Sequence, residues 1–166
     1  GNNGATDFPI SLPGYYRKSG YVWPDGSMVL LFLNSATNSS KIFKFNASGL
    51  PESSFGTNGT VTHPGRFSQL EGLADGGFLA FNQFGAIAQV LKFLPNGNTD
   101  YSFGNGGLVQ LPVASGFSFG GLKVYADGKI LVAGNQGNNQ NRATVLIRLN
   151  ANGSSDQTFG IVGKVI

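Results

Sequence analysis

The sequence contains no cysteine among its 166 residues. Disulfides, thiol catalysis and cysteine-based metal sites are therefore excluded. Histidine is almost as scarce, since His63 is the only one. A catalytic triad around His63 would need a nucleophile and an acid as partners, and no His-Glu-x-x-His motif occurs. We therefore expect His63 to be a surface or loop residue and expect no catalytic residues.

Charge and long apolar segments are also scarce. Charged residues make up 11% of the chain and the net charge is +3, with the basic residues scattered singly apart from Arg17-Lys18. No stripe of basic and aromatic residues accompanies them, so nucleic acid is not an expected partner. The longest apolar run, Met28 to Leu33, is far shorter than the roughly 20 residues of a membrane helix. We therefore expect no membrane insertion.

Glycine, in contrast, is abundant, with 26 copies. Glycine and asparagine in such numbers are typical of short strands joined by tight turns. The length is that of one ordinary domain, which is enough to bury a core. The composition therefore favours an all-β fold whose surface is kept soluble by amides and hydroxyls more than by charge.

The main signal is a pattern of about 50 residues that occurs three times. Each copy has an Asp-Gly pair followed by an apolar stretch, which predicts a hairpin with a type I′ turn, in which both central residues have positive φ. The Asp-Gly pairs are Asp25-Gly26, Asp75-Gly76 and Asp127-Gly128. The apolar stretches that follow cover 28–32, 78–81 and 130–133.

After a polar loop, each copy continues with a second apolar strand and a closing element. These strands cover 41–45, 90–94 and 145–149, and we expect their Lys and Arg side chains to face outward. The closing element reads acid-x-Ser/Thr-Phe-Gly-x-x-Gly and is followed by a short β-rich stretch. Its residues are Glu52, Phe55, Gly56 and Gly59 in the first copy, Asp100, Phe103, Gly104 and Gly107 in the second, and Asp156, Phe159, Gly160 and Gly163 in the third.

The third copy, with its segments 127–134, 146–153 and 156–160, resembles the bacterial delta-60 repeat family of β-propeller proteins. The resemblance extends over almost the whole chain, although the first copy departs from it at 50–52 and the second at 94–95. It implies four-stranded blades around an axis and no settled biochemical activity. The residues agree, because a strand before each Asp-Gly turn, such as Leu122 to Tyr125, completes four strands per repeat.

We therefore predict an all-β fold of tandem four-stranded antiparallel blades of a β-propeller. Residues 15–64, 65–112 and 113–166 are the three repeats, and residues 1–14 are the outer strand of a preceding repeat. Gly1-Asn2-Asn3-Gly4 matches the Gly-x-x-Gly of the closing element, and the surplus strand is expected at Ala5 to Ile10. Propellers close with about four to eight blades, so this chain alone is expected not to close a ring. The rest of a longer parent chain, or identical subunits in a ring or filament, would cover the open blade edges.

The repeated acids and phenylalanines are the most prominent candidate site residues. One carboxylate per blade, from Glu52, Asp100 and Asp156, would suit a cation, but an acid two places before Ser or Thr is also well placed to stabilise a turn. No Asp-x-Asp-x-Asp run occurs, so we favour the turn and expect no metal site. The repeated phenylalanines are expected to fill the space between blades, and the glycines after them to supply positive φ or close approach.

Recognition is expected on the loops after the second strand of each blade, because these loops differ in length and polarity. They cover 34–40, 82–85 and 135–142. The Gly-rich stretches 104–107 and 120–121 lack the strand-to-helix context of a phosphate-binding loop, and no cofactor is expected. An aromatic carbohydrate groove is an alternative to core packing for five residues, which are Trp23, Tyr15, Tyr16, Tyr125 and Phe84.

The sequence therefore predicts a non-catalytic propeller module of an extracellular or cell-surface bacterial protein. Its expected role is structural assembly, adhesion or the binding of a protein or glycan. Two alternatives remain open. In the first, the chain would be a segment of a polysaccharide lyase or hydrolase whose active site lies in other blades or in a partner. In the second, the chain would bind peptides by strand addition at an open sheet edge.

Overall fold

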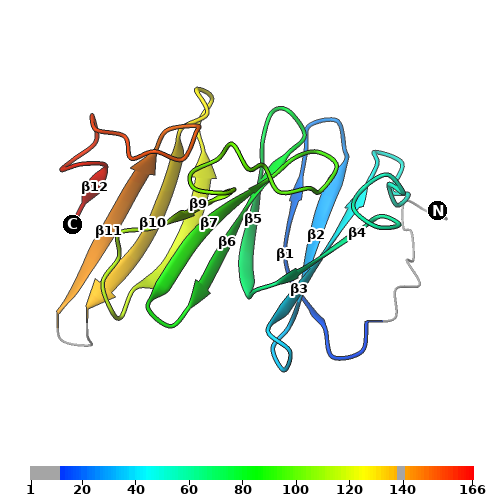
Figure 1. The fold of residues 1–166 in the computed structure, drawn as a ribbon, viewed down its shortest axis with the longest axis horizontal. Helices are drawn as coiled ribbons and strands as arrows, with labels where there is room; N and C mark the ends of the chain where they lie inside the picture. The colour runs from blue at the N-terminus through cyan, green and yellow to red at the C-terminus, as the bar shows by residue number, and fades with distance from the viewer. Residues whose placement is uncertain (1–11, 138–140) are drawn as a thin grey trace.

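The computed structural model describes residues 12–137 and 141–166. Within these ranges the regular structure consists of strands, which form three four-stranded antiparallel sheets that lie side by side in chain order (Figure 1). The first sheet contains β1 (Tyr16–Val22), β2 (Met28–Asn34), β3 (Ser39–Phe45) and β4 (Thr60–Pro64); the second contains β5 (Phe67–Gly72), β6 (Phe78–Phe84), β7 (Ile87–Phe93) and β8 (Leu108–Gln110); the third contains β9 (Ser118–Val124), β10 (Ile130–Gly137), β11 (Arg142–Leu149) and β12 (Lys164–Val165).

The predicted fold class is confirmed, because the sheets are propeller-like blades that do not close into a ring. Within each sheet the strands are ordered as they occur in the chain. The surplus strand expected at Ala5 to Ile10 and the Gly1-Asn2-Asn3-Gly4 match lie outside the described residues, as does most of the segment 1–14. The described part of the chain contains no helix that is long and apolar enough to cross a membrane.

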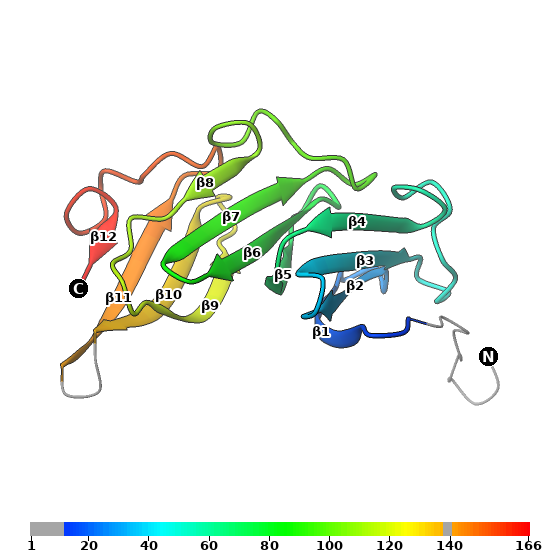
Figure 2. The ribbon, with the colours of Figure 1, turned by 60° about the horizontal axis from the view of Figure 1, so that its bottom comes forward.

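The first strand of every sheet lies at the inner edge, where neighbouring sheets meet. β5 contacts both β1 and β9, whereas β4, β8 and β12 lie along the opposite, outer edge (Figure 2). Consecutive strands run antiparallel, so each sheet has two ends of different composition. We call the end with the hairpins 23–27, 73–77 and 125–129 the Asp-Gly end, and the end where β2 meets β3 and β6 meets β7 the loop end.

The Asp-Gly hairpins do not have the predicted type I′ turn. Asp25 does not have positive φ, whereas Gly26 does, at +88°. Trp23 and Ser27 are joined by a bond from Trp23 N to Ser27 O of 2.9 Å, and Gly26 N donates to Trp23 O, also at 2.9 Å. This is a three-residue loop, in which a type I turn is followed by a left-handed residue, and it needs glycine only at its last position. The same pair of bonds recurs around Gly49, Gly76, Gly97, Gly128 and Gly153.

The predicted recognition loops are shorter than expected, because the strands continue into their polar residues. Asn82, Gln83 and Phe84 belong to β6 and pair with Gln89, Ala88 and Ile87, so only residues 85–86 remain in the second loop. In the third loop, residues 135–137 belong to β10, and 138–140 lie outside the described residues. The first loop connects β2 to β3 through residues 35–38.

Two apolar cores hold the sheets together, one between the first and second sheets and one between the second and third. The second sheet contributes to both, since Phe78 and Ala80 face the first sheet while Leu79 and Phe81 face the third. Alternate residues of a strand point to opposite faces, so the central blade is apolar on both faces. The large phenylalanine content of the chain is concentrated here, and Phe78 stacks on Phe93 with ring centroids 5.0 Å apart.

Candidate functional site

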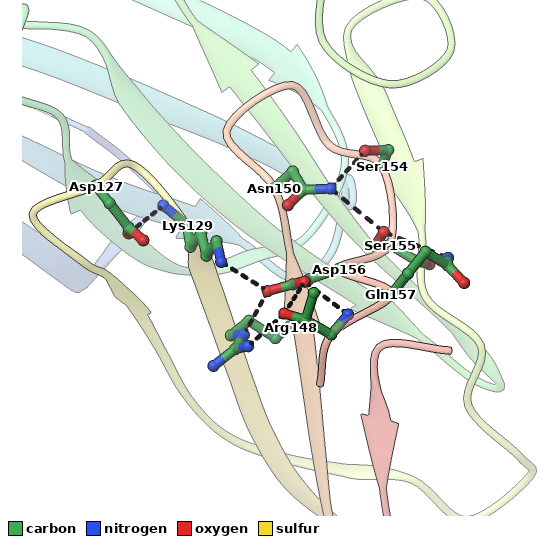
Figure 3. A network of polar contacts seen from close by, with 9 residues as sticks. Asp127, Lys129, Arg148, Asn150, Ser154, Ser155, Asp156 and Gln157 are labelled. Carbon is green, nitrogen blue, oxygen red and sulfur yellow. Dashed lines mark hydrogen bonds and ion pairs between the residues drawn. The ribbon is translucent and has the colours of Figure 1, made fainter. Parts of the chain in front are cut away.

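Asp156 lies at the centre of a polar network in the turn after β11. Its Oδ1 accepts hydrogen bonds from the backbone N of Thr158 at 3.0 Å and from Thr158 Oγ1 at 2.7 Å. Its Oδ2 lies 2.7 Å from Arg148 Nε and 3.1 Å from Lys129 Nζ. Figure 3 shows Lys129 and Arg148 pointing toward Asp156. Both carboxylate oxygens are therefore occupied by donors from the same blade.

The other two blades repeat this arrangement in reduced form. Asp100 Oδ1 accepts from the backbone N of Ser102 at 3.1 Å, and its Oδ2 pairs with Lys92 Nζ at 2.9 Å. Glu52 Oε2 lies 3.4 Å from Lys44 Nζ. Each cation stands eight positions before its acid, a regular spacing that sequence reasoning did not use.

The prediction that these strand cations face outward is therefore wrong. Lys44 is buried and also donates to Pro95 O at 3.1 Å, across the contact to the second sheet. Lys92 and Arg148 are half-buried. The closing turn folds back over the strand and brings its carboxylate to the cation, so a charge that a single strand would expose is neutralised under a loop.

The surroundings of Asp156 and Asp100 stabilise the ionised form of both carboxyl groups. The hydroxyl of Thr158 is the main cause that lowers the pKa of Asp156, followed by the backbone N of Thr158. The hydroxyl of Ser102 is the main cause that lowers the pKa of Asp100, followed by Lys92. A carboxylate held ionised by two hydrogen bonds and an ion pair is a turn stabiliser, as the spacing of acid and Ser/Thr suggested.

The phenylalanine after each acid lies at the boundary between blades. Phe55 and Phe103 are 0% and 1% exposed. The next backbone N, that of Gly56 or Gly104, donates to the following sheet, at Asn96 O (2.8 Å) or Asn152 O (2.9 Å). Gly56 has a φ of +55°, and a Cβ there would lie 2.3 Å from Thr60 O, so glycine is required for this approach.

Phe159 holds the same position in the third sheet but is only half-buried. Its ring lies under Arg148, with the guanidinium carbon 4.4 Å from the ring centroid. In the part of the chain that the structure describes, the backbone N of Gly160 has no acceptor. The third blade therefore exposes an aromatic ring, that of Phe159, and a backbone donor, Gly160 N. In the first two blades the equivalent ring and donor contact the next sheet.

The apolar side chains of the two outer sheets alternate between buried and half-exposed. In β10, Ile130 and Val132 are buried while Leu131 and Ala133 are half-exposed. In β2 the phase is reversed, since Val29 and Leu31 are buried and Met28 and Leu30 are half-exposed. We define the last outer face by Leu131, Ala133, Leu146, Phe159 and Val165, and the first outer face by Met28, Leu30 and Phe43.

The candidate aromatic groove does not form, because its residues lie at opposite ends of the sheets. Trp23 is buried at the Asp-Gly end and donates from Nε1 to Leu73 O at 2.8 Å. Tyr125 lies at the same end, next to the third hairpin, whereas Tyr15, Tyr16 and Phe84 lie at the loop end. Core packing explains Trp23, and the other rings do not share one surface.

His63 is neither a loop nor a freely exposed surface residue, which corrects the prediction. It lies in β4, and its ring packs 4.8 Å from that of Phe67 and 6.0 Å from that of Phe93. Burial lowers the pKa of its imidazole. Alternation along β4 places this side chain toward the second sheet, where it fills space between blades.

The remaining sequence candidates are structural in their geometry. Gly104 and Gly107 form the tight turn before β8 with positive φ, and Gly120 and Gly121 lie within β9. Asp25, Asp75 and Asp127 each accept the backbone N two residues later, at 2.9 to 3.1 Å. Over residues 12–137 and 141–166, no group of three or more His, Asp or Glu side chains is placed to hold a metal ion.

One comparison with known proteins finds a match. Residues 126–159 match a family model described as a β-propeller domain of unknown function, DUF5122. The matched segment runs from the third Asp-Gly hairpin to Phe159 and so covers β10, β11 and the Asp156 network. No curated protein matches the chain. The sheets are consistent with the blades of a β-propeller domain, and the match carries no known function.

Proposed function

We propose that this chain is a non-catalytic structural module, a delta-60-type set of propeller blades, whose two outer faces are covered by further blades of the same kind. A longer chain or a second copy would supply them. The observation that carries this proposal is the reversed alternation of burial in the outer sheets. The central sheet, which has a blade on each side, shows no such alternation at the corresponding positions of β6.

The outer faces resemble two halves of the contact that the chain already makes twice. The last outer face contains Phe159 and Val165 at the positions of Phe103 and Val109, which pack on the third sheet. The first outer face contains Met28 and Phe43 at the positions of Phe78 and Leu91, which pack on the first sheet. Val165, however, is 41% exposed. Burying this apolar surface is favourable at about 25 cal/mol per Å².

The non-catalytic and extracellular parts of the proposal have different support. Two of the three repeated carboxylates, Asp100 and Asp156, are held ionised by turn and strand donors, and this suits stabilisation better than proton transfer. A surface of glycine, asparagine and hydroxyl side chains with few charges suits a protein outside the cell that assembles or adheres. We therefore propose that the module acts at the surface of a bacterial cell.

Sedimentation velocity on the chain tests the proposal. In the isolated chain the available blades are those of a second copy, so we expect concentration-dependent association that continues beyond the monomer, since a head-to-tail contact need not close. Leu131→Asp puts a charge on the last outer face and should shift the chain toward the monomer. A well-folded monomer at high protein concentration would contradict the proposal.

Tyr101→Asp is the matched control for this experiment. Tyr101 is 76% exposed and lies in the turn after β7, away from both outer faces. Its replacement adds the same charge to an exposed apolar side chain and should leave association unchanged. If Tyr101→Asp and Leu131→Asp weaken association equally, net charge and not the last outer face controls it.

A further inference from the structure

The inner strands share an irregularity that sequence reasoning did not detect. The pairing of β1 with β2 shifts between Arg17 and Ser19, and that of β5 with β6 shifts between Phe67 and Gln69. β9 shifts at the corresponding position, next to Gly120. Each shift leaves one residue unpaired in a β-bulge, and these residues are Lys18, Ser68 and Gly120. Bulges turn side chains away from the regular alternation, and they are common beside functional sites.

A cavity of about 490 Å³ lies at the loop end, where the three inner strands meet. Two of the bulged residues, Lys18 and Ser68, line it, and Arg66, the residue just before β5, joins them. The rest of its wall includes Tyr16, Gln83 and Ser118, so all three sheets contribute. The residues that line this cavity are mostly polar, whereas those of the two cores between the sheets are apolar.

Two groups in this wall have free hydrogen-bonding capacity. The hydroxyl oxygen of Ser68 is buried and has no partner among the described residues. A buried polar atom left without a partner is unfavourable, so a ligand that bonds to this hydroxyl would satisfy it. Gln83 donates from Nε2 to Phe117 O at 2.6 Å, which fixes its amide and leaves the side-chain oxygen as an acceptor.

The charges of the chain are separated between the two ends of the sheets. The carboxylates of the described residues all lie in the half toward the Asp-Gly end, where they meet cations such as Lys44, Lys92 and Arg148. The loop end carries basic side chains and no described carboxylate. These basic residues are Arg17, Lys18, Lys41, Arg66 and Arg142. Neither Lys18 nor Arg66 has an ion-pair partner in the described ranges.

We propose that the loop-end cavity is a binding site for a carboxylated saccharide, such as a uronic acid residue of an acidic glycan. Lys18 and Arg66 would hold the carboxylate through charge-assisted hydrogen bonds. Gln83 would accept from one sugar hydroxyl, and the Ser68 hydroxyl, which is buried in this structure, would turn about its Cα–Cβ bond to donate to another. Tyr16 is 45% exposed and offers a ring against which an apolar sugar face packs. The site lies within the three blades, so it does not depend on the assembly proposed above.

Isothermal titration calorimetry with tetragalacturonate tests this site, with neutral cellotetraose as the comparison ligand. We expect binding of the acidic tetrasaccharide and none of the neutral one. Replacing each cation should weaken binding about tenfold, so Lys18→Gln combined with Arg66→Gln should weaken it more than about 30-fold. Binding should also weaken as salt is raised, because these charges are partly exposed.

Arg142→Gln is the matched control, since Arg142 is a loop-end cation that does not line the cavity. It should change affinity less than about twofold. An equal loss in Arg142→Gln and in the double variant would overturn the proposal, because it would mean diffuse attraction to the basic end. Equal binding of cellotetraose, or binding of phosphatidylserine vesicles without binding of tetragalacturonate, would also overturn it.

Ser68→Ala keeps the test decisive if the double variant folds poorly. It removes a buried hydroxyl without a described partner, so thermal stability should be unchanged or slightly higher. Binding of tetragalacturonate should nevertheless fall about fivefold or more, because the ligand loses a hydrogen bond. Unchanged affinity in a folded Ser68→Ala variant would contradict the site.

Discussion

Single residues in this chain show how a β-protein with little charge uses the charge that it has. The acid of each closing turn pairs with a cation eight residues earlier, and Asp100 and Asp156 also accept hydrogen bonds from their own turn. Such pairs are worth little when exposed, but Asp156 is buried to 3% exposure and satisfied at both oxygens. The ion pairs of the repeated acids therefore join the closing turn to the strand before it.

Asp156→Asn should lower the melting temperature near pH 6. The variant loses the ion pairs with Arg148 and Lys129, and one amide cannot accept at both of the original positions. The pKa of Asp156 is lower when the chain is folded, so the carboxylate adds stability above the unfolded pKa of about 3.9. That stability is lost as pH falls toward the folded pKa. The difference in melting temperature between the two proteins should therefore shrink below about pH 4.

Asp127→Asn is the control for this comparison. Asp127 is exposed and, among the described residues, accepts one hydrogen bond, from Lys129 N at 3.1 Å. The melting temperature of Asp127→Asn should stay close to that of the unmodified chain both near pH 6 and below about pH 4. A difference for Asp156→Asn that is constant from pH 6 to pH 2 would show that ionisation of Asp156 does not stabilise the fold.

The role of the acids could be predicted from the sequence, but the position of their cation partners could not. The local spacing of Asp156 and Thr158 is enough to favour a turn, because the bonds involve adjacent backbone. The position of Lys44 depends on a loop that folds back over β3 and on the neighbouring sheet. His63 is similar, since its packing on Phe67 and Phe93 joins two sheets and has no local sequence signal.

At the scale of the element, the repeated hairpin positions the contact between blades. Gly97 closes the hairpin after β7 with a φ of +86°, and it approaches Phe55 and Val61 of the preceding blade. The same position in the third sheet is Gly153, which approaches Phe103 and Val109. Glycine is therefore required there for two reasons, the left-handed backbone and the space that the neighbour occupies.

Gly97→Ala should destabilise the chain by about 3 kcal/mol. The added Cβ would lie 2.5 Å from Val61 Cγ2 and 2.8 Å from Phe55 Cε2, and the left-handed backbone adds its own penalty. Gly85→Ala is the control, because φ there is +60° but, apart from its two chain neighbours, no described residue has an atom within 4 Å of the added Cβ. It should cost only about 1 kcal/mol. If urea unfolding shows the same loss of unfolding free energy for both variants, glycine is needed at position 97 only for its left-handed backbone and not for the space that Phe55 and Val61 occupy.

Strands and turns were easier to predict than their ends. Apolar stretches located the cores of β2, β3, β6, β7, β10 and β11. Of these, β6 and β10 extend further than expected, because Asn82 and Asn135 pair across the hairpin despite their polarity. The type I′ prediction failed because the Asp-Gly pair occupies the last two positions of a three-residue loop. The inner-strand bulges at Lys18 and Ser68 leave no sequence pattern, since any residue type can be unpaired there.

At the scale of the whole molecule, three blades make two interblade contacts and leave two faces that fit the same contact. The repeat predicted this count of blades. What the structure adds is the chemistry of each face, with Phe159, Leu131 and Leu146 half-exposed on the last and Met28, Leu30 and Phe43 half-exposed on the first. The charges add a second axis, since the loop end is basic and the Asp-Gly end is mixed. Assembly would use the faces and leave the loop-end cavity open.

Amide hydrogen exchange at Gly104 and Gly160, measured by NMR across protein concentration, tests the central claim most directly. Gly104 N donates to Asn152 O of the next blade at 2.9 Å, so its amide should exchange slowly at every concentration. Gly160 should exchange rapidly in the dilute chain and become protected as the chain associates, because a further blade then supplies its acceptor. Rapid exchange of Gly160 in the fully associated chain would contradict the account, since association would then use a surface other than the last outer face.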